Sequence, residues 1–150
     1  MRLPQSMDPD AVPLALALAV ARVLADIEGT TDVEWLVVLS EDDEGADEPD
    51  DEDAMIMCFI GAVGGSGYGV TVRSDEDEEA AAVFLADEWS DQVFETLAEK
   101  YDLEFARRWP PCPRPGHDHA LDPVLRRGQG VWVCRDVVAP IGHLAEALPN

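Results

Sequence analysis

Residues 54–72 read AMIMCFIGAVGGSGYGVTV, two strand-like stretches joined by a glycine-rich run. The first stretch, residues 54–60, is apolar at every position, which is typical of a strand buried on both faces. In the second, residues 68–72, larger side chains alternate with small or polar ones, as in a strand with one buried face. Glycines in residues 61–69 allow the positive φ angles that a tight turn needs. The whole stretch therefore predicts a β-hairpin.

Another buried strand is predicted upstream, at residues 33–40 (VEWLVVLS), where nearly every side chain after Glu34 is apolar. Three strands in succession, the last two joined by a tight turn, favour an antiparallel meander. The connection between the first two, residues 41–53, is acidic at 10 of its 13 positions. Such a run repels itself and has no apolar group to anchor it, so we expect a solvated loop.

Helices are predicted on either side of this meander. In residues 11–28 apolar side chains recur at helical spacing, Gly29 marks a stop, and Asp8 and Asp10 are candidate caps. A longer helix is predicted over residues 78–101, where large side chains recur every four positions. The apolar faces of the strands and the second helix are expected to pack as one core. Its expected members are Trp35, Val37, Ile56, Phe59, Val70, Leu85, Trp89, Val93 and Leu97.

The last part of the chain has a different character. Prolines at four positions within residues 110–115 exclude a helix there. Residues 131–133 predict a short strand, and residues 137–148 a strand followed by a short helix. The predicted fold class is α+β: helix, three-stranded antiparallel meander, long helix, then a Pro-rich Cys/His tail with a short strand. We expect residues 1–106 to form an acidic α+β core, with residues 107–150 packed on it as one globular unit.

Acidic residues dominate the charge of the chain. Its 150 residues hold 32 acids against 10 bases, a formal charge of −22. Residues 1–106 contain 28 of the acids and four bases, whereas residues 107–150 contain four acids and six arginines. This balance argues against direct nucleic-acid binding, which needs cations to replace counterions on phosphates, and against docking on an anionic membrane. It favours a basic protein as the partner.

The cysteine count and the apolar segments indicate a reducing compartment. Cys58, Cys112 and Cys134 make an odd number without the close spacing of a disulfide scaffold. Residues 11–21 are apolar but too short to span a bilayer as a helix, and two aspartates precede them where a signal peptide carries bases. We therefore expect a cytoplasmic protein in which Cys58 is buried as a small apolar side chain.

The tail concentrates residue types that bind zinc. All three histidines and two of the three cysteines lie in the last 39 residues, and zinc accepts thiolate and imidazole in one tetrahedral shell. Four residues separate Cys112 from His117, which is a usual spacing in zinc sites, and Cys134 ends a predicted strand. His119, or alternatively His143, completes a set of four ligands for a structural zinc ion. The alternative is a Pro-rich loop that binds no metal.

Four short motifs run through this tail: W-P-x-C-P at residues 109–113, H-x-L-x-P at 119–123, V-W-V-C at 131–134 and I-G-x-L at 141–144. The pattern resembles the tail of small acidic proteins of actinobacteria, and it covers about a quarter of the chain. The resemblance implies an actinobacterial source and a Cys/His module, and it implies no activity. Pro115 stands where this pattern commonly has a histidine.

Non-catalytic protein binding is the function that the sequence favours, in the manner of an immunity protein or a secretion chaperone. A small zinc-dependent enzyme is the first alternative, although the sequence has neither H-E-x-x-H nor the zinc-deaminase motifs. An acidic mimic of nucleic acid is the second, and it requires carboxylates fixed on a rigid surface. The glycine-rich run lacks a dinucleotide fingerprint and a P-loop lysine. We therefore predict no catalytic residue.

Overall fold

The computed structural model describes residues 7–41, 55–100, 109–117 and 119–148. The acidic run, apart from Glu41, and the expected boundary between core and tail fall outside these described residues. The first part of the fold comprises a 3₁₀ turn, two helices and three strands. In chain order they are η1 (Pro9–Ala11), α1 (Leu14–Thr30), β1 (Trp35–Glu41), β2 (Met55–Ala62), β3 (Gly67–Arg73) and α2 (Glu78–Lys100).

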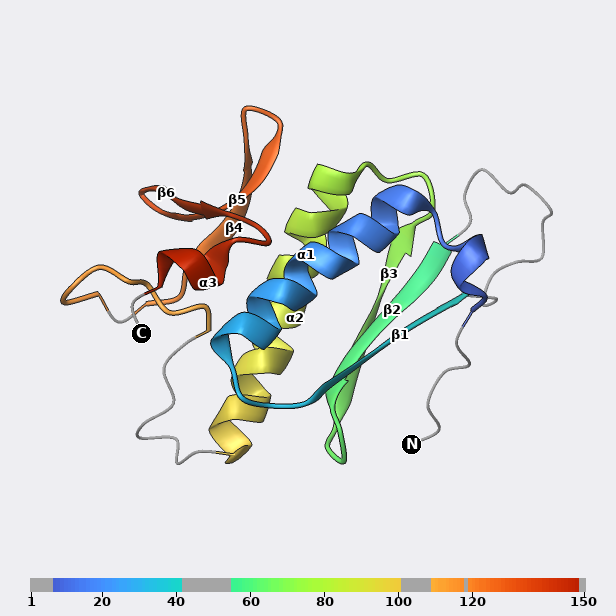
Figure 1. Cartoon of the computed structure of the whole chain (residues 1–150), viewed down its shortest axis with the longest axis horizontal. Coiled ribbons are helices and arrows are strands. Elements are labelled where there is room, and N and C mark those ends of the chain that lie inside the picture. Colours follow the sequence, from blue (N-terminus) through green and yellow to red (C-terminus); the bar gives the residue numbers. More distant parts are fainter. Residues whose placement is uncertain (1–6, 42–54, 101–108, 118, 149–150) are drawn as a thin grey trace.

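The main sheet is the predicted antiparallel meander, with strand order β1-β2-β3. Ile60 pairs with Val37 on one side, and Cys58 pairs with Val70 on the other. The glycine-rich run forms the β2–β3 turn, where Gly64 has a φ of 81°. Both helices lie on one face of this sheet (Figure 1). The α+β class and the order of the elements are therefore as predicted.

The second helix agrees with its predicted bounds, whereas α1 begins three residues later than expected and continues through Gly29, the predicted stop, to Thr30. Asp77 caps α2, because its Oδ1 accepts the N–H of Ala80 at 2.9 Å. The expected caps of α1 were wrong. Asp8 Oδ1 accepts the N–H of Asp10 within the preceding turn, and Pro13 occupies the N-cap position of α1 without any side-chain hydrogen bond.

The core contains most of the residues predicted for it. Five are buried, and Trp35, Val37 and Leu97 are partly buried against the same cluster. Phe59 is the exception: it is 7% exposed but lies outside that cluster. Since neighbouring side chains of a strand point to opposite faces, Phe59 lies on the face away from the helices, over Gly67. The buried five are Ile56, Val70, Leu85, Trp89 and Val93.

The tail forms a second antiparallel sheet, in which the two predicted strands and the short final helix are present and a further strand precedes them. Its elements are β4 (Asp122–Arg126), β5 (Gln129–Cys134), β6 (Asp136–Pro140) and a short helix, α3 (Leu144–Ala147). Strand β4 was missed because Pro123 indicates a break in a strand. The structure tolerates this proline because β4 is an edge strand that pairs only with β5.

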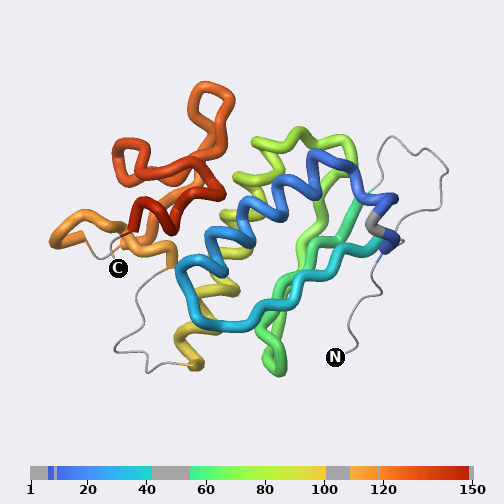
Figure 2. Tube along the Cα trace, in the orientation of Figure 1, coloured from blue at the N-terminus to red at the C-terminus, as the bar shows by residue number. Residues whose placement is uncertain are grey.

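The two helices lie between the two sheets (Figure 2). Trp132 of β5 and Leu144 of α3 belong to the same buried cluster as Val23 of α1 and Leu85 of α2. One continuous core therefore joins the tail to the rest of the molecule.

Candidate metal centre

A small hairpin carries three of the four candidate ligands. Leu121 N–H donates to Pro110 O at 2.8 Å, and Cys112 N–H donates to His119 O at 3.3 Å. The chain reverses at Gly116, whose φ of 82° favours glycine. These backbone bonds place Cys112 opposite His119.

The fourth candidate, Cys134, arrives from the second sheet. It is the last residue of β5, and the chain turns into β6 at Arg135, which has a φ of 67°. Its Sγ lies 3.3 Å from His117 Nδ1 and 3.3 Å from His119 Nε2. The fold thus brings together two segments whose cysteines are 22 positions apart in the sequence.

The four donor atoms lie close enough together to share one metal ion. His117 Nδ1 lies 3.3 Å from His119 Nε2 and 3.7 Å from Cys112 Sγ, and all four atoms lie within 4.8 Å of one another. Tetrahedral zinc, with bonds of about 2.3 Å to sulfur and about 2.0–2.1 Å to nitrogen, holds its ligand atoms about 3.3–3.8 Å apart. The four contacts given above fall in that range, and the two remaining pairs of donor atoms, both involving Cys112, lie within 4.8 Å. Cys112, His117, His119 and Cys134 are therefore compatible with a metal ion.

One imidazole is oriented by a contact outside the cluster. His119 Nδ1 lies 2.9 Å from the carbonyl oxygen of Ala120. With its proton on Nδ1, this histidine donates to that carbonyl and presents the Nε2 lone pair to the cluster, which is the usual arrangement of a metal-bound histidine.

Burial and the neighbouring arginines act on the pKa of Cys134 in opposite directions. Cys134 is buried, whereas Cys112 is half-buried. Burial raises the pKa of the Cys134 thiol, and Cys112 raises it further, while Arg114 and Arg135 lower it. A metal ion therefore has to displace the proton of the Cys134 thiol, which makes its binding depend on pH.

The structure separates the remaining candidates from the site. His143, the alternative fourth ligand, lies at the start of α3 with its Nδ1 3.5 Å from Glu146. Cys58 is buried in the main sheet as expected, and burial raises its pKa to about 12. Neither residue belongs to the described cluster of ligands.

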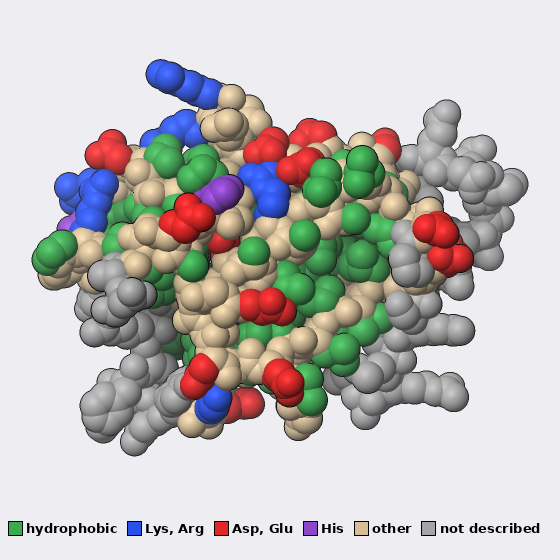
Figure 3. Space-filling view, in the orientation of Figure 1, with side chains coloured by type: hydrophobic (Ala, Val, Ile, Leu, Met, Phe, Trp, Pro, Cys, Tyr) green, Lys and Arg blue, Asp and Glu red, His purple; other side chains and the backbone are tan. Residues whose placement is uncertain are grey.

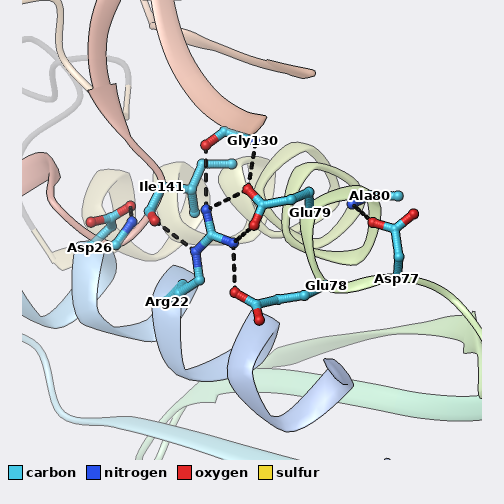
Figure 4. Close-up of polar contacts among 9 residues, drawn as sticks. Arg22, Asp26, Asp77, Glu78, Glu79, Ala80, Gly130 and Ile141 are labelled. Atoms are coloured by element: carbon cyan, nitrogen blue, oxygen red, sulfur yellow. Dashed lines mark hydrogen bonds and ion pairs between the residues drawn. The ribbon is translucent and has the colours of Figure 1, made fainter. Parts of the chain in front are cut away.

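A polar row on α1, which the sequence analysis missed, holds the tail against the helices. Arg22 donates to the carbonyl of Ile141 at 2.9 Å and to Glu79 at 3.0 Å, and Glu79 also accepts the N–H of Gly130 at 2.8 Å (Figure 4). One turn later, Asp26 is 1% exposed. Burial raises the pKa of Asp26, although three N–H donors oppose this.

These residues recur every four positions, at Arg22, Asp26 and Thr30. In a helix that is otherwise largely apolar, this spacing predicts a second, polar face. It is the sequence pattern from which this set of residues could have been found. The apolar stripe belongs to the buried core, whereas the polar row contacts the tail.

The bond between Arg22 and Glu79 predicts a specific loss of stability in acid. Arg22 lowers the pKa of Glu79 below its usual 4.5, chiefly by hydrogen bonding. Because the folded pKa lies below the unfolded one, this stabilisation is complete above pH 4.5 and is lost as the pH falls through the folded pKa. We expect Glu79→Gln to destabilise the protein near neutral pH and to differ progressively less from wild type in acid.

Urea unfolding from about pH 7 to about pH 3 measures this difference. In an Arg22→Gln background, Glu79→Gln should show little of that pH dependence. An equal dependence in both backgrounds would contradict the assignment to Arg22.

Comparison of the chain with protein-family models, curated proteins and solved structures finds no match. Within the described residues, every helix is too short or too polar to cross a membrane.

Proposed function

We propose that the tail holds one structural zinc ion and that the chain is a non-catalytic module which binds a basic protein. The observation that carries the proposal is the convergence of two sulfur and two imidazole nitrogen atoms within 4.8 Å of one another, with four of their six distances between 3.3 and 3.7 Å. Zinc suits this donor set, because it accepts thiolate and imidazole together and prefers four ligands.

A full set of protein ligands favours a structural role over a catalytic one. Catalytic zinc keeps one position for water or substrate beside three protein ligands. Here Cys112, His117, His119 and Cys134 together supply four donor atoms. The alternative, a small zinc-dependent enzyme, requires one of them to leave the metal.

An acidic stripe on α2 supports the binding half of the proposal. Asp87, Asp91, Glu95 and Glu99 follow at intervals of four and are all exposed. Like charges at this spacing destabilise a helix by about 0.2–0.5 kcal/mol per pair. Among the described residues no Lys or Arg forms an ion pair with any of the four. A rigid row of carboxylates attracts a basic partner and accelerates its association.

The charges elsewhere have a different distribution. In the view of Figure 3, acidic side chains are scattered over the surface, and Lys and Arg side chains gather chiefly at the end formed by the second sheet.

A nucleic-acid mimic is the third candidate function. It needs a dense rigid array of carboxylates, and most of the longest acidic run lies outside the described residues.

Metal content tests the zinc half. We expect the purified chain to carry about one zinc per molecule, and we expect both Cys112→Ser and His119→Ala to lose it. Cys58→Ala and His143→Ala are the matched controls and should retain the metal, because both residues lie outside the cluster. Acid should release zinc, since the thiols and imidazoles take up protons.

Two results would contradict this assignment. One is a wild-type chain free of metal after purification without chelators and after exposure to zinc. The other is loss of zinc in His143→Ala with retention in His119→Ala. A cobalt-substituted protein whose visible spectrum shifts on addition of a hydroxamate would reveal an open metal position and would favour the enzyme.

Neutralising the acidic stripe tests the binding half. The triple variant Asp87→Asn, Asp91→Asn, Glu95→Gln should slow association with a basic partner and weaken its dependence on salt. The variant Asp122→Asn, in the second sheet, is the control and should leave both unchanged. Equal association rates for the triple variant and the wild type would exclude this stripe as the binding surface.

A further inference from the structure

Two tryptophans lie next to the two cysteine ligands in the sequence and next to each other in space. Trp109 precedes Cys112 by three residues, and Trp132 precedes Cys134 by two. Their exposed fractions are 3% and 0%. The rings meet edge to face, with centroids 5.6 Å apart and an interplanar angle of 84°. Each tryptophan therefore fixes the start of one ligand-bearing segment.

Both indole N–H groups are bound by α1. Trp132 Nε1 donates to Asp26 Oδ2 at 2.8 Å, and Trp109 Nε1 donates to Thr30 Oγ1 at 2.8 Å. Asp26 and Thr30 are four positions apart, so they lie on one face of the helix. The Thr30 hydroxyl in turn donates to the carbonyl of Asp26 at 2.7 Å. One helical turn thus sets the separation of the two segments.

We infer that Asp26 and Thr30 are positioning residues of the metal centre: by anchoring Trp132 and Trp109, they pre-organise Cys134 and Cys112 for one ion. The inference rests on the proposed function. If both segments were unordered before the metal binds, ordering them would cost conformational entropy, and this cost would lower the metal affinity. Holding both segments on α1 removes part of the cost before the metal binds.

The same helix end offers a matched control. Thr31, the next residue, accepts the indole N–H of Trp35 at 2.9 Å and donates to the carbonyl of Ile27 at 2.9 Å. This bond is of the same kind, but it joins α1 to β1 rather than to the tail. Thr30→Val and Thr31→Val therefore each delete one hydroxyl that accepts a hydrogen bond from an indole N–H. Only the first deletion affects the segments that carry the metal ligands.

The test measures zinc and cobalt affinity of the full chain by competition with a chelator, at a temperature where every variant is folded. We expect Thr30→Val to weaken metal binding about 10-fold, the lower end of the range for outer contacts of metal sites. Thr31→Val should stay within about two-fold of wild type even if it lowers thermal stability comparably. The cobalt spectrum of Thr30→Val should also broaden, since its ligands are held less uniformly.

A second variant guards against a folding defect. Asp26→Asn keeps the shape of the side chain and one acceptor oxygen, and we expect it to weaken metal binding as well. A wild-type chain that binds no metal overturns both this inference and the proposed zinc site. A wild-type chain that binds metal, with Thr30→Val indistinguishable from Thr31→Val in affinity, overturns this inference alone.

Discussion

Replacing Trp89 by alanine is expected to lower the free energy of unfolding by about 3–5 kcal/mol, a large share of the stability of a domain of this size. Trp89 is 0% exposed and belongs to the buried cluster between the two sheets. Its removal leaves a cavity that a helix packed on both sides closes poorly. Urea unfolding followed by circular dichroism measures the loss.

Two further variants of α2 test whether the loss comes from the burial of Trp89 or simply from the removal of an aromatic side chain. Phe84→Ala removes an aromatic side chain that is 40% exposed, and it should cost much less. Trp89→Phe should cost less than half as much as Trp89→Ala. It keeps most of the ring, and it deletes an indole N–H that has no acceptor among the described residues. A loss below about 1 kcal/mol for Trp89→Ala would show that this position is not core.

The main sheet and its helices were predictable because the distribution of apolar residues along the sequence is clear. Residues 54–60 are uniformly apolar, and α2 repeats a large side chain every fourth position. Phe59 was misplaced for the same reason. When every position of a strand is apolar, composition does not distinguish its two faces, and only the register with β3 does so.

The ligand types of the candidate metal centre were predictable, whereas the choice between His119 and His143 was not. Ligand spacing restricts Cys112 and His117 to one short loop. The remaining choice depends on the pairing of that loop, in which Cys112 N–H bonds to His119 O, and on the turn after Cys134. Ligand spacing fixes neither feature, and the second sheet, from which Cys134 comes, had been recognised only in part.

The spacing of the polar residues on α1 indicates a second face, but their partners in the tail could not be inferred from local patterns. A buried carboxylate is costly unless its hydrogen bonds are satisfied, and its partners come from far along the chain. Asp26 lies in an apolar helix and reads as an exposed position. Its acceptors are satisfied by Trp132, Gly142 and Leu144, more than 100 positions away.

Asp26→Ala should be among the most damaging substitutions in α1. The carboxylate accepts the Trp132 indole at 2.8 Å and the backbone N–H groups of Gly142 and Leu144 at 2.7 and 2.9 Å. Alanine leaves the buried Trp132 indole and Leu144 amide, and the part-buried Gly142 amide, without an acceptor. At about 1–3 kcal/mol for each unsatisfied buried donor, we expect a loss of about 3–5 kcal/mol.

The damage from Asp26→Ala should concentrate where α1 meets the tail, which distinguishes it from general loss of packing. Hydrogen exchange at Gly142 and Leu144 should accelerate more than exchange within β2, because those two amides lose their acceptor directly. Glu28→Ala removes an exposed acid from the same helix and should change stability by less than about 0.5 kcal/mol. Asp26→Asn retains one acceptor oxygen, so its cost should fall between those of the two alanine variants. Equal costs for Asp26→Ala and Glu28→Ala would mean that α1 does not hold the tail through this carboxylate.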